Sequence, residues 1–164
     1  MAIEIERKFL MHGQPWIEWG KGTLYKQGYA SRGSHLTTRV RIAGDQGFLT
    51  LKGKTKGVQR LEFEYKIPVE DAQELLNLCE GGVIEKYRWI VPFKSMIWEV
   101  DVFLGQNQGL AVAEIELDSV DQAIEYPSWI GQEVSHDHRY FNGALSKFPW
   151  TEWPENQRLE SQKT

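Results

Sequence analysis

The 164-residue sequence has one cysteine, Cys79, and no apolar run near the ~20 residues needed to cross a bilayer. A lone cysteine excludes a disulfide within the chain, and its place in an apolar helical pattern indicates a core thiol. The first residues include Glu4 and Glu6, which are untypical of a secretory signal peptide. We therefore expect a cytoplasmic protein with no membrane association.

The chain also lacks an excess of positive charge. It has 19 Lys and Arg residues against 23 Asp and Glu residues, which gives a net charge of −4. Proteins that bind nucleic acid through a basic face carry the opposite balance, so we expect no nucleic-acid partner. Internal repeats and low-complexity segments are missing too, and the length fits a single domain with a substantial core.

The sequence has instead a series of like charges separated by one residue. In a strand, residues i and i+2 point to the same face, so each pair stands side by side and repels. Acidic pairs of this kind favour a divalent metal, and basic pairs favour a polyanion such as a phosphate chain. The acidic pairs are Glu4/Glu6, Glu62/Glu64, Glu99/Asp101 and Glu114/Glu116, and the basic pairs are Arg39/Arg41, Lys52/Lys54 and Lys86/Arg88.

Alternating hydrophobicity and turn residues predict a mainly β protein with a few helices. Eight short-connected strands favour a closed antiparallel β-barrel, which has no exposed edges. Helices are predicted from residue 68 to about 80, from 119 to just before Pro127, and from 135 to about 147. The predicted strands are residues 2–11, 23–31, 37–43, 47–52, 58–67, 83–91, 96–104 and 110–118.

Two arrangements of this barrel are open. In an ordinary barrel the charges face water and the apolar residues fill the interior. An eight-stranded barrel has little interior space, however, and the apolar set includes Phe63, Trp89 and Trp98. The predicted helices also need an apolar sheet surface to cover. Both points favour an inverted barrel, in which the charges face a polar tunnel and the apolar faces lie under helices or a partner subunit.

Several ordered motifs resemble the CYTH, or triphosphate tunnel metalloenzyme, superfamily, and in particular its short bacterial members. Glu4-Ile5-Glu6-Arg7-Lys8 matches the ExExK signature of that superfamily. The similarity covers about residues 1–149, which we expect to form the domain, with residues 150–164 as a C-terminal tail. The other matching segments are Arg39-Val40-Arg41, Leu49 to Gly53, Arg60 to Tyr65, Glu85 to Arg88, Trp98 to Phe103, Ala113 to Leu117, and Trp129 to Val134 followed by Asp137, Arg139-Tyr140 and Asn142.

The resemblance implies a barrel with a charged interior that hydrolyses a triphosphate with Mg²⁺ or Mn²⁺. It favours inorganic tripolyphosphate as the small-molecule substrate, cleaved to diphosphate and phosphate. An adenylate cyclase on the same scaffold is the alternative, and a non-catalytic polyphosphate- or nucleotide-binding domain is a third possibility. We also expect a possible homodimer, with tryptophans such as Trp150 and Trp153 on the outer surface or in that contact.

The resemblance and the charge pattern together assign roles to individual residues. Carboxylates suit a hard divalent cation, and lysines and arginines suit phosphate oxygens. His12, His35, His136 and His138 lie outside the charged strands, and we expect them on the surface. The predicted metal ligands are Glu4, Glu6, Asp101, Glu114 and Glu116, with Glu99 beside Asp101; the predicted substrate-binding residues are Lys8, Arg39, Arg41, Lys52, Lys86 and Arg88; and the predicted catalytic residues are Glu4, Lys8, Glu62 and Lys86.

Overall fold

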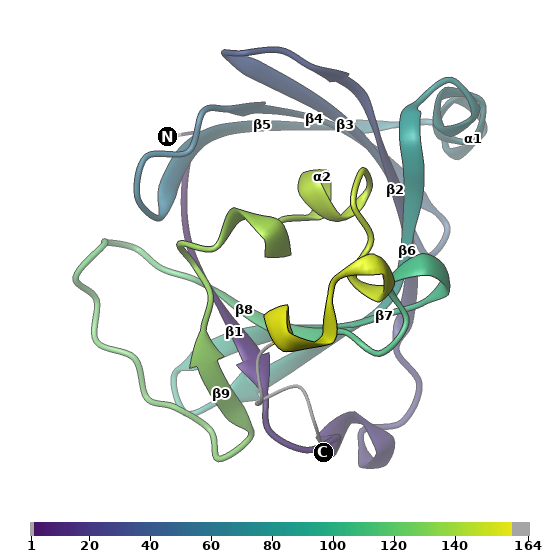
Figure 1. Cartoon of the computed structure of the whole chain (residues 1–164). Coiled ribbons are helices and arrows are strands. Elements are labelled where there is room, and N and C mark those ends of the chain that lie inside the picture. Colours follow the sequence, from purple (N-terminus) through teal and green to yellow (C-terminus); the bar gives the residue numbers. More distant parts are fainter. Residues whose placement is uncertain (1, 159–164) are drawn as a thin grey trace.

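The computed structural model describes residues 2–158, which form one β-barrel (Figure 1). Eight antiparallel strands follow the order β5-β4-β3-β2-β6-β7-β8-β1, and a β5–β1 pairing closes the ring. The predicted closed barrel is therefore confirmed. The strands are β1 (Ile3–Met11), β2 (Thr23–Arg32), β3 (Leu36–Ala43), β4 (Gln46–Gly53), β5 (Gln59–Ile67), β6 (Glu80–Phe93), β7 (Met96–Phe103), β8 (Ala111–Glu116) and β9 (Ile130–Glu133).

The barrel is inverted, with its charged faces inside and its apolar faces outside. On β3, Val40 and Ile42 pack outward against helix α1 (Val69–Asn77), whereas Arg39 and Arg41 line an internal cavity. The side-chain period of two explains why one strand serves both surfaces. A one-residue shift in register would exchange the two faces of a strand, so the alternation of charge fixes the pairing.

Two apolar clusters cover the outside of the barrel. The first lies beneath α1, where Ala72 and Leu76 contact Val40 and Ile42. The second covers β1, β7 and β8 and is centred on Trp98, which is fully buried beneath Tyr126 and Trp129 of the long segment after β8. The short helix η1 (Pro15–Glu18) and the residues that follow it cover this cluster as well. Bulky aromatic residues therefore pack on the exterior of the barrel, because its narrow interior could not accommodate them.

The C-terminal segment differs from the single helix predicted for residues 135–147. It contains η3 (His138–Tyr140) and α2 (Asn142–Leu145), separated by Phe141, whose extended backbone (φ −72°, ψ 141°) interrupts the helix. Figure 1 shows this segment across one end of the barrel rather than on its outer wall. Tyr140 and Leu145 are fully buried there, in one cluster with the inward-facing Leu10 of β1.

The described part of the predicted tail continues this packing. Trp150 and Trp153 are buried in the same cluster at the barrel end, not on the outer surface. The Trp153 ring meets the Tyr140 ring edge-on with centroids 5.0 Å apart. Residues 159–164 of the predicted tail lie outside the described residues. The remaining short helices are η2 (Gly105–Asn107), η4 (Trp150–Glu152) and η5 (Glu155–Gln157).

The helix predicted after residue 119 is wrong, since this segment is a loop. The expected cap does not form: the Gln122 side chain accepts a hydrogen bond from the Asp118 backbone at 2.6 Å, and Ser119 instead donates to Asp121. The sequence also missed β9, a short strand that pairs with the end of β1 beyond its contact with β5. From residue 2 to 158, the structure has no helix with the length and apolar character to span a membrane.

Candidate active site

A polar cavity of about 460 Å³ occupies the barrel interior. It brings together side chains from opposite walls, because all eight strands of the barrel and the C-terminal segment contribute to its lining. Two predicted site residues, Lys86 and Asp101, do not line this cavity. The predicted residues that do line it are Glu4, Glu6, Lys8, Arg39, Arg41, Lys52, Glu62, Arg88, Glu114 and Glu116.

An acidic cluster lies on one side of the cavity. Carboxylate oxygens of Glu6, Glu99 and Glu114 all lie within 4.8 Å of one another. Burial, together with the charges of Glu114 and Glu4, raises the pKa of Glu6 well above its usual range. Burial and the charge of Glu114 also raise the pKa of Glu99, although Arg88 opposes this. Burial opposes ionisation of Glu114 too, but the charges of Lys8 and Arg88 lower its pKa well below the usual range. Converging carboxylates, two of which resist ionisation in the free protein, fit a hard divalent cation that would balance their charge.

The membership of this cluster corrects part of the sequence prediction. Glu6 and Glu114 meet as expected, but Glu99 is the third member rather than Asp101. Glu116 lies opposite Glu6 in the β1–β8 register and lines the cavity. Glu4 instead turns toward β5.

Glu4 and Glu62 form a coupled pair of carboxylates. Lys52 Nζ lies 3.0 Å from a Glu62 oxygen and 3.8 Å from a Glu4 oxygen. Burial and the side-chain hydrogen bond with Glu62 raise the pKa of Glu4 to about 7. Burial opposes ionisation of Glu62 too, but the hydrogen bond from Glu4 and the charge of Lys52 hold its pKa at about 2. Glu4 therefore gains and loses its proton near neutral pH, while Glu62 stays ionised.

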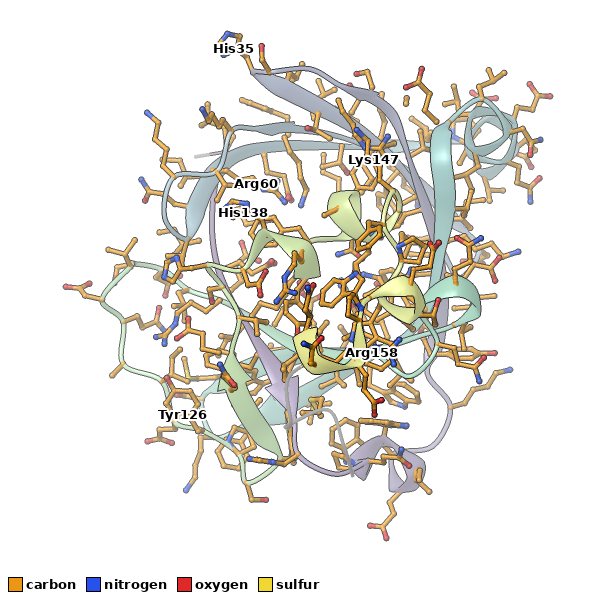
Figure 2. The ribbon with its side chains drawn as sticks, viewed as in Figure 1. His35, Arg60, Tyr126, His138, Lys147 and Arg158 are labelled. Atoms are coloured by element: carbon orange, nitrogen blue, oxygen red, sulfur yellow. The ribbon has the colours of Figure 1, made fainter. Side chains whose placement is uncertain are left out.

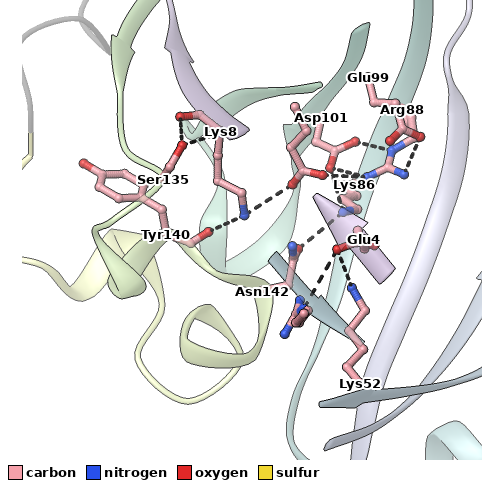
Figure 3. A network of polar contacts seen from close by, with 12 residues as sticks. Glu4, Lys8, Lys52, Lys86, Arg88, Glu99, Asp101, Ser135, Tyr140 and Asn142 are labelled. Carbon is pink, nitrogen blue, oxygen red and sulfur yellow. Dashed lines mark hydrogen bonds and ion pairs between the residues drawn. The ribbon is translucent and has the colours of Figure 1, made fainter. Parts of the chain in front are cut away.

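Asp101 lies outside the cavity lining and pairs with two cations, Lys86 and Arg88 (Figure 3). Its Oδ1 accepts from Arg88 Nε at 2.7 Å, and its Oδ2 accepts from Arg88 at 2.8 Å and from Lys86 Nζ at 2.7 Å. Asp101 and Lys86 are both fully buried. Burial lowers the pKa of Lys86 to about 7, despite the opposing charge of Asp101. The predicted role of Asp101 as a metal ligand does not fit this position, because both carboxylate oxygens already accept from cations.

The C-terminal segment contacts Lys8 and Lys86 from one end of the barrel. Lys8 Nζ lies 3.2 Å from Glu114 and 3.1 Å from the Tyr140 carbonyl oxygen, and the Lys8 backbone donates to Ser135. Lys86 Nζ is 3.3 Å from the amide oxygen of Asn142. Sequence reasoning did not assign Ser135 or Asn142 a role, since their approach to β1 and β6 depends on the path of the chain after β9.

The basic side of the cavity lies along β3, β4 and β5. Arg39 is buried and bonds the Thr50 hydroxyl at 3.2 Å, while its guanidinium lies 3.6 Å from Glu64. Arg41 donates to the Gln27 amide oxygen at 3.0 Å and lies beside the Tyr25 ring. Burial and repulsion from Arg39 and Arg88 lower the pKa of Arg41 to about 10.

Arg60 of β5 and His138 of the C-terminal segment both line the cavity, and Figure 2 labels them both. Arg32 also belongs to this cavity lining. His138 is exposed, as expected, but it borders the cavity instead of lying on a remote surface. Arg32 and Arg60 therefore add positive charge to this part of the cavity lining.

Fold and site together define a class of protein: an inverted β-barrel whose internal cavity lies between an acidic and a basic wall. A profile described as the CYTH domain matches residues 24–149 of the chain. The chain belongs to the CYTH domain family.

Relatives and solved structures agree with this membership. The chain is 47% identical to an inorganic triphosphatase of Acetivibrio thermocellus over 156 residues, covering 94% of this chain and 100% of the relative. It is 37% identical to an inorganic triphosphatase of Nitrosomonas europaea over 147 residues, covering 87% and 96%. The solved structure of an inorganic triphosphatase superposes with a TM-score of 0.63 at 34% identity, covering 87% of this chain and 96% of that one.

Proposed function

We propose that this protein hydrolyses inorganic tripolyphosphate to diphosphate and phosphate with a divalent cation. The observation that carries the proposal is the internal cavity, where an acidic cluster faces a basic wall. A bare chain of phosphates can lie along several cations at once and still approach the carboxylates. Two relatives that cover most of this chain are inorganic triphosphatases, which supports the same activity.

Glu6, Glu99 and Glu114 would hold the cation, with Glu116 at the edge of the set, whereas Glu4 pairs with Glu62 on the β5 side. Oxygen ligands of this kind favour Mg²⁺ or Mn²⁺ over softer metals. The bound ion would neutralise phosphate charge and assist ionisation of the attacking water.

Lys8, Arg39, Arg41, Lys52 and Arg88 would bind the phosphate oxygens, since each lines the cavity. Arginine offers a planar pair of donors to phosphate, and lysine acts as a point charge. Lys86 acts from behind the wall: it shares Asp101 with Arg88, so it helps to fix the direction of that guanidinium. Its predicted role thereby becomes indirect.

Water attacks the terminal phosphorus, and the bridging P–O bond breaks with its electron pair passing to the diphosphate. Glu4, in its ionised form, accepts the proton of the water, because its pKa near 7 suits a base at neutral pH. Glu62 stays ionised, and once Glu4 has taken the proton, Glu4 donates it in a hydrogen bond to Glu62. Lys8 stabilises the charge that develops on the leaving oxygen. Phosphoryl transfer requires mainly such alignment and charge stabilisation from a protein.

Substrate comparison tests this function. We expect kcat/KM for tripolyphosphate to exceed that for ATP at least ~100-fold, equivalent to roughly 2.7 kcal/mol. The reason is that adenosine would keep one end of ATP from the cavity and leave cations without phosphate partners. Phosphate release and cyclic AMP formation are measured in parallel with Mg²⁺ or Mn²⁺ on tripolyphosphate, ATP and thiamine triphosphate.

The same experiment separates the alternatives. Cyclic AMP as the main product from ATP would favour the cyclase. Binding of tripolyphosphate without turnover under any metal condition would favour a non-catalytic sensor.

A further inference from the structure

The cations of the cavity differ in what they are paired with. Lys8 lies near Glu114, Arg39 near Glu64, Lys52 near Glu62, and Arg88 near Asp101 and Glu99. Arg41 differs from these four, because its guanidinium forms no ion pair with a carboxylate among residues 2–158. Arg32 forms none there either, but its guanidinium donates to the Glu80 carbonyl oxygen and the Ser146 hydroxyl.

Neutral groups hold Arg41 instead. Its Nε donates to Gln27 Oε1 at 3.0 Å, and its guanidinium carbon lies 5.1 Å from the centre of the Tyr25 ring. Gln27 is fully buried, and its amide nitrogen has no hydrogen-bond partner among the described residues. The same Tyr25 ring lies 4.8 Å from the guanidinium carbon of Arg88. One ring and one amide thus fix Arg41 in direction and leave its charge uncompensated.

An uncompensated cation that is partly withdrawn from water is costly in the free protein. The depressed pKa of Arg41, caused by burial and by the neighbouring Arg39 and Arg88, reflects that cost. An anion that reaches Arg41 relieves the repulsion and needs to displace no carboxylate. At Lys8 or Arg88, by contrast, a phosphate must compete with an existing acidic partner.

We propose that Gln27 and Tyr25 are positioning residues that keep Arg41 charged, fixed and free of acidic partners, so that Arg41 contributes more to binding the phosphate chain than its ion-paired neighbours. The inference rests on the proposed function and adds two neutral residues of β2 to it. Neither touches the reacting atoms, since both act through Arg41.

Gln27→Glu tests the inference because it gives Arg41 a carboxylate partner of the same shape. We expect KM for tripolyphosphate to rise about tenfold, equivalent to about 1.4 kcal/mol, while kcat stays within about twofold. Calorimetry with tripolyphosphate and no divalent metal should show a dissociation constant about tenfold weaker. Gln27→Met is the matched control: it removes the acceptor and adds no charge, so the dissociation constant should weaken only about threefold, through the lost orientation of Arg41.

Two further comparisons separate a charge effect from general disruption. In an Arg41→Gln background, Gln27→Glu should have no additional effect on binding, because the group through which it acts is missing. Tyr25→Phe, which retains the ring, should bind as wild type, whereas Tyr25→Leu should weaken binding about fivefold. If Gln27→Glu fails to fold, the comparison of Tyr25→Phe with Tyr25→Leu still tests the inference.

Several results would overturn the inference. These are wild-type affinity in Gln27→Glu, a Gln27→Met defect as large as that of Gln27→Glu, or an undiminished effect of Gln27→Glu without Arg41. Equal binding by Tyr25→Leu and wild type would do the same. A wild-type protein that neither binds nor hydrolyses tripolyphosphate would instead contradict the proposed function.

Discussion

Glu6→Gln is expected to reduce kcat for tripolyphosphate about a thousandfold, equivalent to about 4 kcal/mol of transition-state stabilisation. Glu6 suits this test because it belongs to the acidic cluster and forms no ion pair with a lysine or arginine among residues 2–158. The substitution therefore removes one negative ligand and strands no cation. Activity is measured over a titration of Mg²⁺ and Mn²⁺ at saturating substrate.

Stability should not fall in this variant. The pKa of Glu6 is raised by burial and by neighbouring carboxylates, so a neutral amide relieves repulsion in the metal-free protein. Wild type should gain thermal stability with added Mn²⁺, and Glu6→Gln should lose most of that gain. Glu74→Gln, an exposed acid on α1, is the control and should match wild type throughout. Wild-type turnover by Glu6→Gln at limiting metal would contradict the assignment of the cluster.

Asp101→Asn is expected to lower the free energy of unfolding by about 3 kcal/mol, more than any other variant proposed for this protein. Tm would fall by roughly 10 °C. Asp101 is the carboxylate shared by Lys86 and Arg88, and its removal leaves two buried cations without their main partner. Breaking a buried ion pair from one side is costly because the remaining charge stays out of water. Thermal unfolding in the absence of metal measures the effect.

Whether Asp101→Asn loses metal-free stability or metal affinity distinguishes an ion-pair role of Asp101 from metal binding. If Asp101 acts as an ion-pair partner, the loss of stability appears without metal, and excess Mn²⁺ does not restore it. If Asp101 were a metal ligand, the metal-free protein would keep its stability and the defect would appear in metal affinity. Asp45→Asn, in the exposed turn between β3 and β4, is the control for the chemical change itself.

Much of the barrel could be predicted because strand alternation is local information. Arg39 and Arg41 share one face of β3 in any register. Trp98 is too large for a narrow barrel interior, so its face of β7 was expected to lie outside. The resemblance of short motifs added the family, which the match over residues 24–149 confirms. The C-terminal helices were predicted less well, because Phe141 interrupts them and their buried residues pack against a barrel end made by distant strands.

The sequence by itself determined which residues alternate and which faces carry charge, and the bulk of its apolar residues favoured a barrel with a polar interior. The structure decided that the charged faces point inward. Only the tertiary structure decided that Glu99 meets Glu6 and Glu114 while Asp101, two residues further along the same face, pairs with Lys86 and Arg88. It also placed Gln27 and Tyr25 against Arg41. The physical reason is that alternation sets the direction of a side chain within its own strand, whereas its partners depend on register and depth across strands far apart in sequence.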